Sequence, residues 1–546
     1  MKIISKAAAV VFFLGLALTA TVIRADVRAE IVDIIEASIV GEERHLLPAP
    51  IRVRQLIDLF YQARDYNLAW NDGEQIQRVL TVLADSTSHG LNPEDYHYSV
   101  LKALEAEWHK KFRGRDRVRA QFDVLLSDGV LLYARHQLEG KVDPALLESS
   151  WNFSRRDWVA EVVVSNLSTA IDEQNIVPTL ESFEPSLELY DSLRSSLQLY
   201  RQFDESYEFV PIPTDVVLKP GMTHPNIASL RESLRRLQLL QGDADDENVY
   251  DDTLVAAVKH FQALHSLSDD GIVGGNSFRE LNTSYADRID QLRINMDRVR
   301  WVNESRAEDM VVVNIAGYEL YYFVGGELSW ETDVMVGTIR NETPMFQSKI
   351  KYLVLNPTWT VPRSIIRKSL FKKLRDTPGY IEDHNYKLYD SDGVAADPAE
   401  MDWDSYSPGR FPYRVVQQPG PGNALGRVKF IFPNKYAVYL HDTPSRSLFA
   451  QTDRAFSHGC IRVQDPLHFT ELLLDDADKW SRATIDTVIE SGVLQNVRLK
   501  EPLEVLLMYW TASPGDDGRV QFHPDVYRRD ARAVAALKEE PRWDVN

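Results

Sequence analysis

The sequence predicts a multidomain α+β protein, mainly α-helical in its first part and mainly β-stranded in its last. Up to about residue 205, apolar residues recur at helical spacing, and from about residue 309 they alternate with the period of two that strands show. A chain of 546 residues is too long for one ordinary core. Since domains usually hold roughly 100–200 residues, we expect about three of them.

We expect residues 26–210 to form a helical scaffold domain. One helix face is formed by Val53, Leu56, Ile57, Phe60 and Tyr61, and a second by Ile76, Val79, Leu80 and Leu83. Both sets follow the spacing of an amphipathic helix. A glycine and a proline within residues 89–93 then break the pattern, as they do where a helix ends. This part holds no convergent set of catalytic residue types, which favours a structural role.

A proline-rich link precedes a compact unit, for which we predict the bounds 220–284. Its two expected helix faces are formed by Ile227, Leu230, Leu234 and Leu237 and by Leu254, Val258, Phe261 and Leu264. The connecting segments are acidic, and Asp245, Asp269 and Asp270 carry the oxygen ligands that calcium takes. Because the EF-hand spacing closed by a glutamate is absent, we interpret these residues as solvated loop.

Residues 309–535 are expected to form a mainly β domain, preceded by a helical linker at 285–308 and followed by a tail at 536–546. Apolar runs predict strands at 311–313, 320–324, 352–355, 428–432 and 502–510. Residues 433–435 predict a turn, and residues 436–440 predict a return strand that ends at His441. Asp465 followed by Pro466 is typical of the start of a helix.

One segment of this domain, residues 365–410, has little periodicity but carries several lysines and aromatic residues. A long connection inside a compact domain is usually functional or disordered, and the aromatic content favours an ordered lid. The glycine-rich loop 420–426 that follows has one residue too many for a dinucleotide fingerprint, and it precedes a strand rather than a helix. We therefore exclude nucleotide binding.

Charge and the N-terminus indicate where the protein acts. The formal net charge of −20 argues against a nucleic-acid partner, which would require clustered Lys and Arg. Residues 1–25 combine Lys2 and Lys6 with an uncharged apolar run at 7–23, the layout of a secretory signal peptide. Ile23 is not the small residue that cleavage after Ala25 favours, so a retained N-terminal anchor is the alternative. Both predict export.

Cys460 is the only cysteine of the chain. Oxidising compartments favour cysteines paired in disulfides, and this one has no partner in the sequence. A lone thiol in an exported protein indicates chemistry. The alternative is a buried cysteine that acts as a small hydrophobic residue.

The residues around Cys460 suit a thiol nucleophile. A thiol attacks carbonyl groups as its thiolate, which a histidine forms by taking the proton and remaining as an imidazolium. His458 and His441 are the two candidates, and we prefer His441 because a base on a neighbouring strand approaches the nucleophile across space. The backbone N–H groups of Gly459 and Cys460 are candidate oxyanion donors.

Arg462, His458 and a possible metal site each have a functional and a simpler interpretation. Arg462, just past the nucleophile, suits binding of a substrate carboxylate, although a surface charge would look the same. His458 is either part of the site or a structural, hydrogen-bonded residue. The set of His441, Asp442, His458 and Cys460 includes metal-ligating types, but it lacks the paired short spacings of zinc sites, so we predict no metal.

Several stretches resemble a known family. His441 and the later run Ser457-His458-Gly459-Cys460 resemble the active-site motif of the L,D-transpeptidases, whose catalytic domain has the YkuD-type fold. Residues 351–362, 454–463 and 89–96 are similar to the large multidomain branch of that family. Residues 220–284 resemble its three-helix peptidoglycan-binding domain, and residues 365–410 resemble its substrate-capping insertion.

The resemblance implies a mechanism on peptidoglycan that needs no metal or cofactor. Cys460 would attack the diaminopimelate carbonyl of a donor tetrapeptide stem and release D-alanine. The diaminopimelate amine of an acceptor stem would then resolve the thioester into a 3→3 cross-link. His441 would transfer the protons, oriented by the backbone carbonyl of Asp442, while a role for the Asp442 carboxylate stays open. Substrate-binding residues implied in the same way are Arg462, Ser457, Trp359 and Tyr439, and carbapenems are expected to acylate Cys460.

Other functions use the same features. Water or a different amine would make the protein an L,D-carboxypeptidase or an enzyme that tethers proteins to the wall. A wall-binding scaffold with an inactive catalytic domain is a third reading, which the complete motif argues against. The resemblance places the protein in the periplasm of a Gram-negative bacterium, where an anchored N-terminus would contact the inner membrane and other cell-wall synthases are candidate partners.

Overall fold

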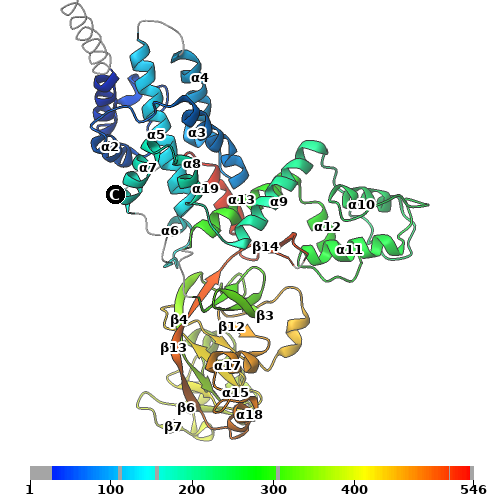
Figure 1. The fold of residues 1–546 in the computed structure, drawn as a ribbon. Helices are drawn as coiled ribbons and strands as arrows, with labels where there is room; N and C mark the ends of the chain where they lie inside the picture. Colours follow the sequence, from blue (N-terminus) through cyan, green and yellow to red (C-terminus); the bar gives the residue numbers. More distant parts are fainter. Residues whose placement is uncertain (1–26, 109–113, 154–158, 303–307, 516, 542–546) are drawn as a thin grey trace, which may run out of the picture.

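The computed structural model describes residues 27–108, 114–153, 159–302, 308–515 and 517–541. The predicted signal peptide or anchor, residues 1–25, lies outside them. Within these ranges, no helix is long and apolar enough to cross a membrane. Figure 1 shows a helical lobe from the first part of the chain, a smaller helical lobe and a β-rich lobe. The predicted multidomain α+β fold class is thus confirmed.

The first lobe is a bundle built around the long helix α5. Its main helices are α2 (Arg54–Ala63), α3 (Gly73–Asp85), α4 (Tyr98–Trp108), α5 (Arg115–Glu139), α7 (Ala160–Asp172) and α8 (Ile176–Glu181). The short α6 (Pro144–Leu147) follows α5, and α9 (Glu188–Ser206) packs mainly on α13 (Tyr285–Arg300), outside the core of this bundle. Side chains on all sides of α5 are buried. The buried Asp128 carboxylate on α5 accepts the backbone N–H of Val53 at 2.9 Å, and Asp123 accepts that of Trp70 at 2.9 Å. These bonds satisfy polar groups that burial would otherwise leave without a partner.

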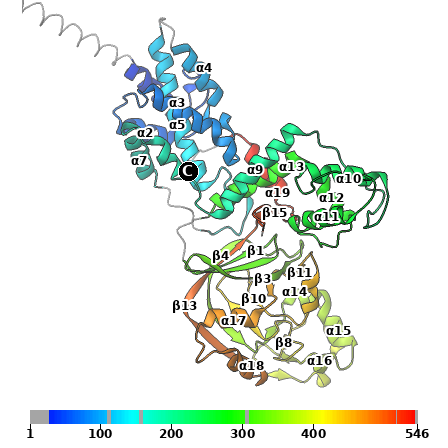
Figure 2. The same cartoon turned by 45° about the vertical axis from the view of Figure 1, so that its right-hand side comes forward.

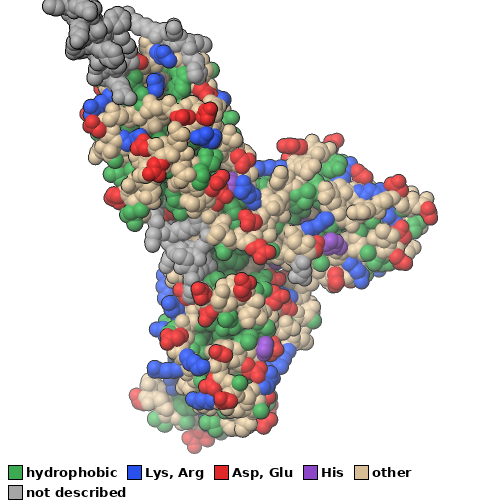
Figure 3. Space-filling model, viewed as in Figure 1, with side chains coloured by type: hydrophobic (Ala, Val, Ile, Leu, Met, Phe, Trp, Pro, Cys, Tyr) green, Lys and Arg blue, Asp and Glu red, His purple; other side chains and the backbone are tan. Residues whose placement is uncertain are grey.

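The second lobe is the predicted three-helix unit, with α10 (Pro225–Arg236), α11 (Asp252–Leu264) and α12 (Gly275–Leu281). The apolar faces of its helices form one core. In the acidic connection, the Glu247 carboxylate accepts two hydrogen bonds from the Arg235 guanidinium, at 2.6 and 2.9 Å. On the face drawn in Figure 3, acidic and basic side chains are interspersed over all three lobes.

Two helices tie the β-rich lobe to the scaffold. α13 (Tyr285–Arg300) runs along α9, and α19 (Asp530–Lys538) packs on α13. Arg298 on α13 and Asp530 on α19 form a buried ion pair at 2.7 Å. α19 runs past residue 535, where the tail was predicted to begin, and Leu537 is buried. The chain therefore returns to the scaffold after completing the β domain.

The β-rich lobe is built on a nine-stranded sheet, seen below the junction in Figure 2. The strand order is β11-β3-β12-β10-β9-β4-β13-β1-β2, and an extra pairing of β2 with β3 closes it on itself. The strands are β1 (Met310–Asn314), β2 (Glu319–Val324), β3 (Glu327–Gly337), β4 (Phe346–Leu355), β9 (Val428–Ile431), β10 (Leu440–His441), β11 (Ala455–Ser457), β12 (Ile461–Val463) and β13 (Gln495–Met508). A separate hairpin is formed by β14 (Ala512–Pro514) and β15 (Val520–Phe522).

Helices α17 (Pro466–Leu474) and α18 (Arg482–Glu490) accompany this sheet. The predicted start of a helix at Asp465-Pro466 is confirmed, since Asp465 is the N-cap of α17 and accepts the backbone N–H of His468. The Asp465 carboxylate thereby satisfies one of the N–H groups that every helix N-terminus leaves without an intrahelical partner.

The predicted return strand does end at His441 and runs antiparallel to β9, but it is shorter than the predicted range 436–440, because only Leu440 and His441 join the ladder. The Asn434 side chain accepts the backbone N–H groups of Tyr436 and Val438 and donates to the Val438 carbonyl. Ala437 has a left-handed backbone, with φ of 56°. An asparagine that bonds its local backbone competes with sheet pairing, and here it holds a loop in front of β10.

The predicted lid is ordered and has its own apolar core. It contains α14 (Arg363–Ile365), a π-helical turn at Ile366–Leu370, α15 (Phe371–Asp376) and α16 (Tyr380–Asp383). A four-stranded sheet in the order β5-β8-β6-β7 completes it, from β5 (Trp359–Thr360), β6 (Tyr386–Tyr389), β7 (Ala395–Ala396) and β8 (Arg414–Gln417). The ordered segment is thus wider than the predicted range 365–410.

Candidate active site

The site lies where three strands of the large sheet run side by side. β10 pairs in parallel with β12, which sets Leu440 beside Ile461 and His441 beside Arg462. Leu440 and Ile461 are buried in the core of the sheet. Because side chains alternate along a strand, His441 and Arg462 emerge on the opposite face, and so does Cys460, the residue before Ile461. Three of the predicted site residues therefore share one face.

Lys429 joins this face from β9 and was not predicted as a site residue. β9 is antiparallel to β10 and sets Lys429 opposite His441. Lys429 Nζ lies 5.9 Å from the centre of the Tyr439 ring, and burial lowers the pKa of Lys429. The sequence held a signal for it, since a lysine between two buried apolar residues of one strand must face the other way.

His441 is held in the tautomer that a base requires. Its Nδ1–H donates to the backbone carbonyl of Asp442 at 2.5 Å, which leaves the lone pair on Nε2. Among the described residues, Nε2 has no hydrogen-bond partner. Burial, reinforced by the positive charges of Arg462 and Lys429, lowers the pKa of His441 to about 3. The imidazole is therefore neutral at neutral pH and able to accept a proton.

The Asp442 carboxylate, whose role the sequence left open, is directed away from His441. Its Oδ2 accepts the backbone N–H of Arg427 at 2.9 Å and the Arg427 Nε–H at 2.8 Å, and the Arg446 guanidinium lies 3.3 Å from Oδ1. Gly426 makes room for this arrangement, because a Cβ on Gly426 would lie 2.4 Å from the Asp442 side chain. The Asp442 carbonyl therefore makes the contact expected of a residue that orients His441, while its carboxylate binds Arg427 and Arg446.

The half-buried Cys460 thiol contacts Ala437 and Tyr439. Its S–H donates to the Ala437 carbonyl at 3.7 Å. Burial raises the pKa of Cys460, and hydrogen bonds from Tyr439 and the charge of Arg462 offset only part of this rise. Burial thus favours the neutral forms of both groups, and the imidazolium beside a thiolate stays a prediction for the step of attack. Within the described ranges no hydrogen bond joins the thiol to His441.

We expect the thiol to alkylate slowly at neutral pH for the same reason. The rate with iodoacetamide should rise about tenfold per pH unit, because the thiolate reacts and its fraction grows in that proportion below the thiol pKa. A Tyr439→Phe variant, which loses the hydroxyl that favours the thiolate, should react still more slowly at each pH. Alkylation followed by mass spectrometry between pH 6 and 9 measures both rates. A plateau already reached at pH 6 would instead indicate a thiolate–imidazolium pair.

The Ser457 hydroxyl holds the turn from Ser457 to Cys460 through two hydrogen bonds. The Ser457 hydroxyl accepts the N–H of Gly459 at 3.0 Å and donates to the carbonyl of Cys460 at 2.5 Å. The prediction of Gly459 as an oxyanion donor is therefore wrong, since its N–H is already bonded. The Cys460 N–H has no partner among the described residues. Ser457 is buried and its hydroxyl is used within the turn, so we no longer expect it to contact substrate.

The remaining predicted residues, Arg462, His458 and Trp359, differ in their burial and contacts. The Arg462 Nε is buried without a hydrogen-bond partner, and no carboxylate pairs with its guanidinium among the described residues. His458 is exposed, and burial of its ring together with the charges of Lys368 and Arg462 lowers its pKa. Trp359 lies in β5 and packs against the lid core. In the described parts of the chain, no group of three or more His, Cys, Asp or Glu side chains is placed to hold a metal ion.

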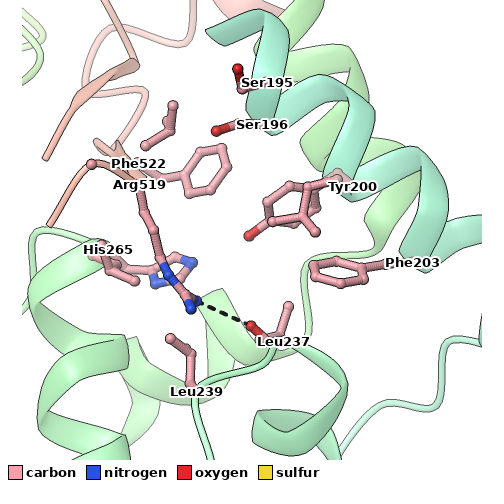
Figure 4. Close-up of a pocket in the computed structure, with 13 residues that line it drawn as sticks. Ser195, Ser196, Tyr200, Phe203, Leu237, Leu239, His265, Arg519 and Phe522 are labelled. Atoms are coloured by element: carbon pink, nitrogen blue, oxygen red, sulfur yellow. Dashed lines mark hydrogen bonds between the residues drawn. The ribbon is translucent and has the colours of Figure 1, made fainter. Parts of the chain in front are cut away.

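A pocket that shares no residue with this site lies at the boundary between domains (Figure 4). It has a volume of about 150 Å³ and is lined by α9, the three-helix unit and the β14–β15 hairpin. Arg519 of the hairpin donates to the Leu237 carbonyl at 3.3 Å, and His265 stacks on Phe522. We interpret it as the packing seam that holds the three-helix unit against the scaffold.

Three family models match the chain. They are a scaffold domain at residues 55–197, a provisionally described peptidoglycan binding domain at 223–281 and the YkuD L,D-transpeptidase catalytic domain at 308–485. The resemblance noted in the sequence is confirmed at this level. The chain carries an L,D-transpeptidase catalytic domain of the YkuD family, joined to scaffold and peptidoglycan-binding domains.

A Haemophilus influenzae protein provisionally named an L,D-transpeptidase is 37% identical over 264 residues, 48% of this chain and 52% of that protein. The chain thus spans about half the length of the curated relative it matches. Solved L,D-transpeptidases from Stackebrandtia nassauensis and Xylanimonas cellulosilytica are each 14% identical, with TM-scores of 0.22 and 0.15. Each match covers 55% of this chain, and 97% and 100% of theirs. At such low TM-scores these two structures do not support any statement about the fold or function of this chain.

Proposed function

We propose that this protein is an exported cysteine transpeptidase that forms 3→3 cross-links between peptidoglycan stem peptides in the periplasm of a Gram-negative bacterium. The observation that carries the proposal is the shared face of Cys460, His441 and Arg462 within an L,D-transpeptidase domain. A nucleophile, a neutral base and a cation without a carboxylate partner are the groups that acyl transfer between carboxylate-bearing peptides requires.

In the first step, the Cys460 thiol gives its proton to His441 Nε2 as sulfur attacks the diaminopimelate carbonyl of the donor tetrapeptide. A C–S bond forms, the C–N bond to D-alanine breaks, and His441 returns the proton to the departing amine. In the second step, the side-chain amine of an acceptor diaminopimelate attacks the thioester, and its proton passes through His441 to the sulfur. One amide bond is exchanged for another, so no cofactor or redox partner is needed.

Local charge supports an anionic substrate. The whole chain carries −20, yet this face presents Arg462 and Lys429, and the exposed Lys368 of the lid lies near enough to act on the pKa of His458. Stem peptides carry several carboxylates, which guanidinium and ammonium groups bind. During attack, the Cys460 N–H is the donor available to the developing oxyanion. The same chemistry makes Cys460 open to acylation by carbapenems.

Removing the Arg462 guanidinium should weaken substrate binding more than it slows chemistry. We expect Arg462→Gln to lower kcat/KM about 10- to 100-fold, mainly through KM, because a charge-assisted hydrogen bond contributes roughly 1.5–3 kcal/mol. Arg462→Lys, which keeps the charge, should lose less. Initial rates of dimer formation over a range of stem concentrations give both parameters. An unchanged KM in Arg462→Gln would rule out the carboxylate-binding role.

The deciding experiment incubates the purified protein with disaccharide-tetrapeptides and identifies the products by mass spectrometry, with Cys460→Ala as the control. Dimers that lack one D-alanine, formed only when Cys460 is present, would establish 3→3 transpeptidation. Tripeptides without dimers would establish an L,D-carboxypeptidase instead, and protein–stem conjugates would establish tethering. Binding to peptidoglycan without any product would favour the non-catalytic wall-binding scaffold.

A further inference from the structure

A loop behind the Cys460 turn bonds to the turn directly. Residues 338–343 connect β3 to the segment before β4, and the Thr338 N–H donates to the Ser457 carbonyl at 3.1 Å. The loop lies beside Gly459, since a Cβ built on Gly459 would be in ordinary van der Waals contact with the Glu342 carbonyl oxygen, at 3.5 Å. Thr343, at the end of the loop, is completely buried. Neither the motif nor the proposed mechanism uses this residue.

The Thr343 hydroxyl is fully engaged between the loop and the turn. It donates to the Gly459 carbonyl at 3.0 Å and accepts the Gly337 N–H at 2.9 Å. The Tyr527 hydroxyl braces the same loop from the C-terminal segment. It accepts the Thr343 N–H at 3.1 Å and donates to the Gly337 carbonyl at 2.7 Å. Gly337 must be glycine here, since a Cβ would lie 2.0 Å from the Asn341 carbonyl oxygen.

The bond to the Gly459 carbonyl determines where the Cys460 N–H points. Both groups belong to one planar trans peptide, so they point in opposite directions. The adjoining peptide groups are held by the Ser457 hydroxyl, at the Gly459 N–H and the Cys460 carbonyl. With the Gly459 carbonyl bonded to the buried Thr343, the free Cys460 N–H is directed away from the loop, into the site. An oxyanion donor is effective only when it is aimed in advance at the place where charge develops.

We propose that Thr343 is a positioning residue for the oxyanion donor of this site. Its hydroxyl holds the Gly459–Cys460 peptide in the orientation that presents the Cys460 N–H to the reacting carbonyl. The inference rests on the proposed thioester chemistry. It adds to that chemistry the residue that orients the Cys460 N–H, the proposed oxyanion donor.

Two reactions of the Cys460 thiol distinguish a change in the orientation of the Cys460 N–H from a general disturbance of the site. When a carbapenem acylates Cys460, sulfur attacks the lactam carbonyl, an oxyanion develops, the C–S bond forms, and the ring nitrogen leaves with the thiol proton. When iodoacetamide alkylates Cys460, the thiolate displaces iodide from a saturated carbon and no oxyanion develops. The oxyanion donor therefore affects the first rate and not the second.

The test compares three variants of the full chain by the rates of both reactions, followed by mass spectrometry. Thr343→Val keeps the shape but loses the hydroxyl, and we expect acylation to fall about 10- to 100-fold, less than the roughly 10²–10³ for complete loss of a donor. Its alkylation should stay within about twofold, because the thiol environment is unchanged. Thr343→Ser, which keeps the hydroxyl, should restore acylation. Tyr527→Phe loosens the same loop without touching the Gly459 carbonyl and should affect acylation much less.

Each alternative result has a distinct meaning. Equal losses of acylation and alkylation in Thr343→Val, or equal losses of acylation in Thr343→Val and Tyr527→Phe, would overturn the positioning role and leave the proposed function standing. Unchanged acylation in Thr343→Val would do the same. If the unaltered protein is alkylated but forms neither a carbapenem adduct nor a stem thioester, the proposed function fails, and the role of Thr343 fails with it.

Discussion

Replacing Cys460 by alanine should abolish cross-link formation and carbapenem adducts while the protein stays folded. We expect a loss of about 10⁴- to 10⁶-fold in kcat, because the covalent route requires this sulfur and removing a nucleophile costs that much in comparable enzymes. The structure offers no substitute, since Cys460 is the only cysteine of the chain. Product analysis by mass spectrometry with stem tetrapeptides measures the loss.

The cost to stability should be small. One sulfur-sized group is removed from a half-buried position, so we expect the free energy of unfolding to fall by about 1 kcal/mol or less. Thermal unfolding of both proteins checks this. Cross-linking retained by a folded Cys460→Ala protein would refute the thioester mechanism, and loss of folding would show that the cysteine is structural.

Replacing His441 by alanine should slow acylation about 10²- to 10⁴-fold at pH 7, the range that a positioned general base supplies. The neutral imidazole, held by the Asp442 carbonyl, takes the thiol proton during attack. In the variant, attack depends on the small fraction of thiol that is already ionised. Burial raises the thiol pKa, so that fraction is low at pH 7.

The two proteins should differ in the shape of their pH profiles. Since the pKa of His441 is lowered to about 3, the base of the unaltered protein is already deprotonated well below neutral pH. Its acylation rate should therefore be nearly flat from about pH 5 until the thiol itself begins to ionise. The rate of the His441→Ala protein should rise about tenfold per pH unit over the same range, because only the thiolate reacts. Parallel profiles for the two proteins would exclude His441 as the base.

The candidate nucleophile and base could be proposed from the sequence because they belong to a local and specific pattern. Ser457 to Cys460 are consecutive, and His441 ends a run of apolar residues. Together with the resemblance to the L,D-transpeptidase motif, this indicated a nucleophile and a preferred base. The resting charge state could not be predicted in this way. Whether a thiol and an imidazole form an ion pair depends on how deeply both are buried and on Arg462 and Lys429, which strand pairing brings to the same face.

The hydrogen bonds within the turn from Ser457 to Cys460 also could not be predicted from the pattern of residues in the sequence. The sequence made Gly459 and Cys460 equal candidates as oxyanion donors. Only the folded turn shows that the Ser457 hydroxyl occupies the first N–H and leaves the second without a partner among the described residues. Thr343 lies more than a hundred residues away from the Gly459 carbonyl to which it bonds, and nothing in the local sequence marks it.

By itself the sequence determined the fold class, the succession of helical and β-rich parts, and the nucleophile and base candidates, because these follow from periodicity and residue type. The tertiary structure decided the register that groups His441, Cys460, Arg462 and Lys429, the burial that favours the neutral thiol and imidazole, and the Ser457 bond that occupies the Gly459 N–H. It also decided that α19 returns to the scaffold past the β domain. The physical reason is that burial, strand register and long-range hydrogen bonds are properties of the packed chain, and no local stretch of residues carries them.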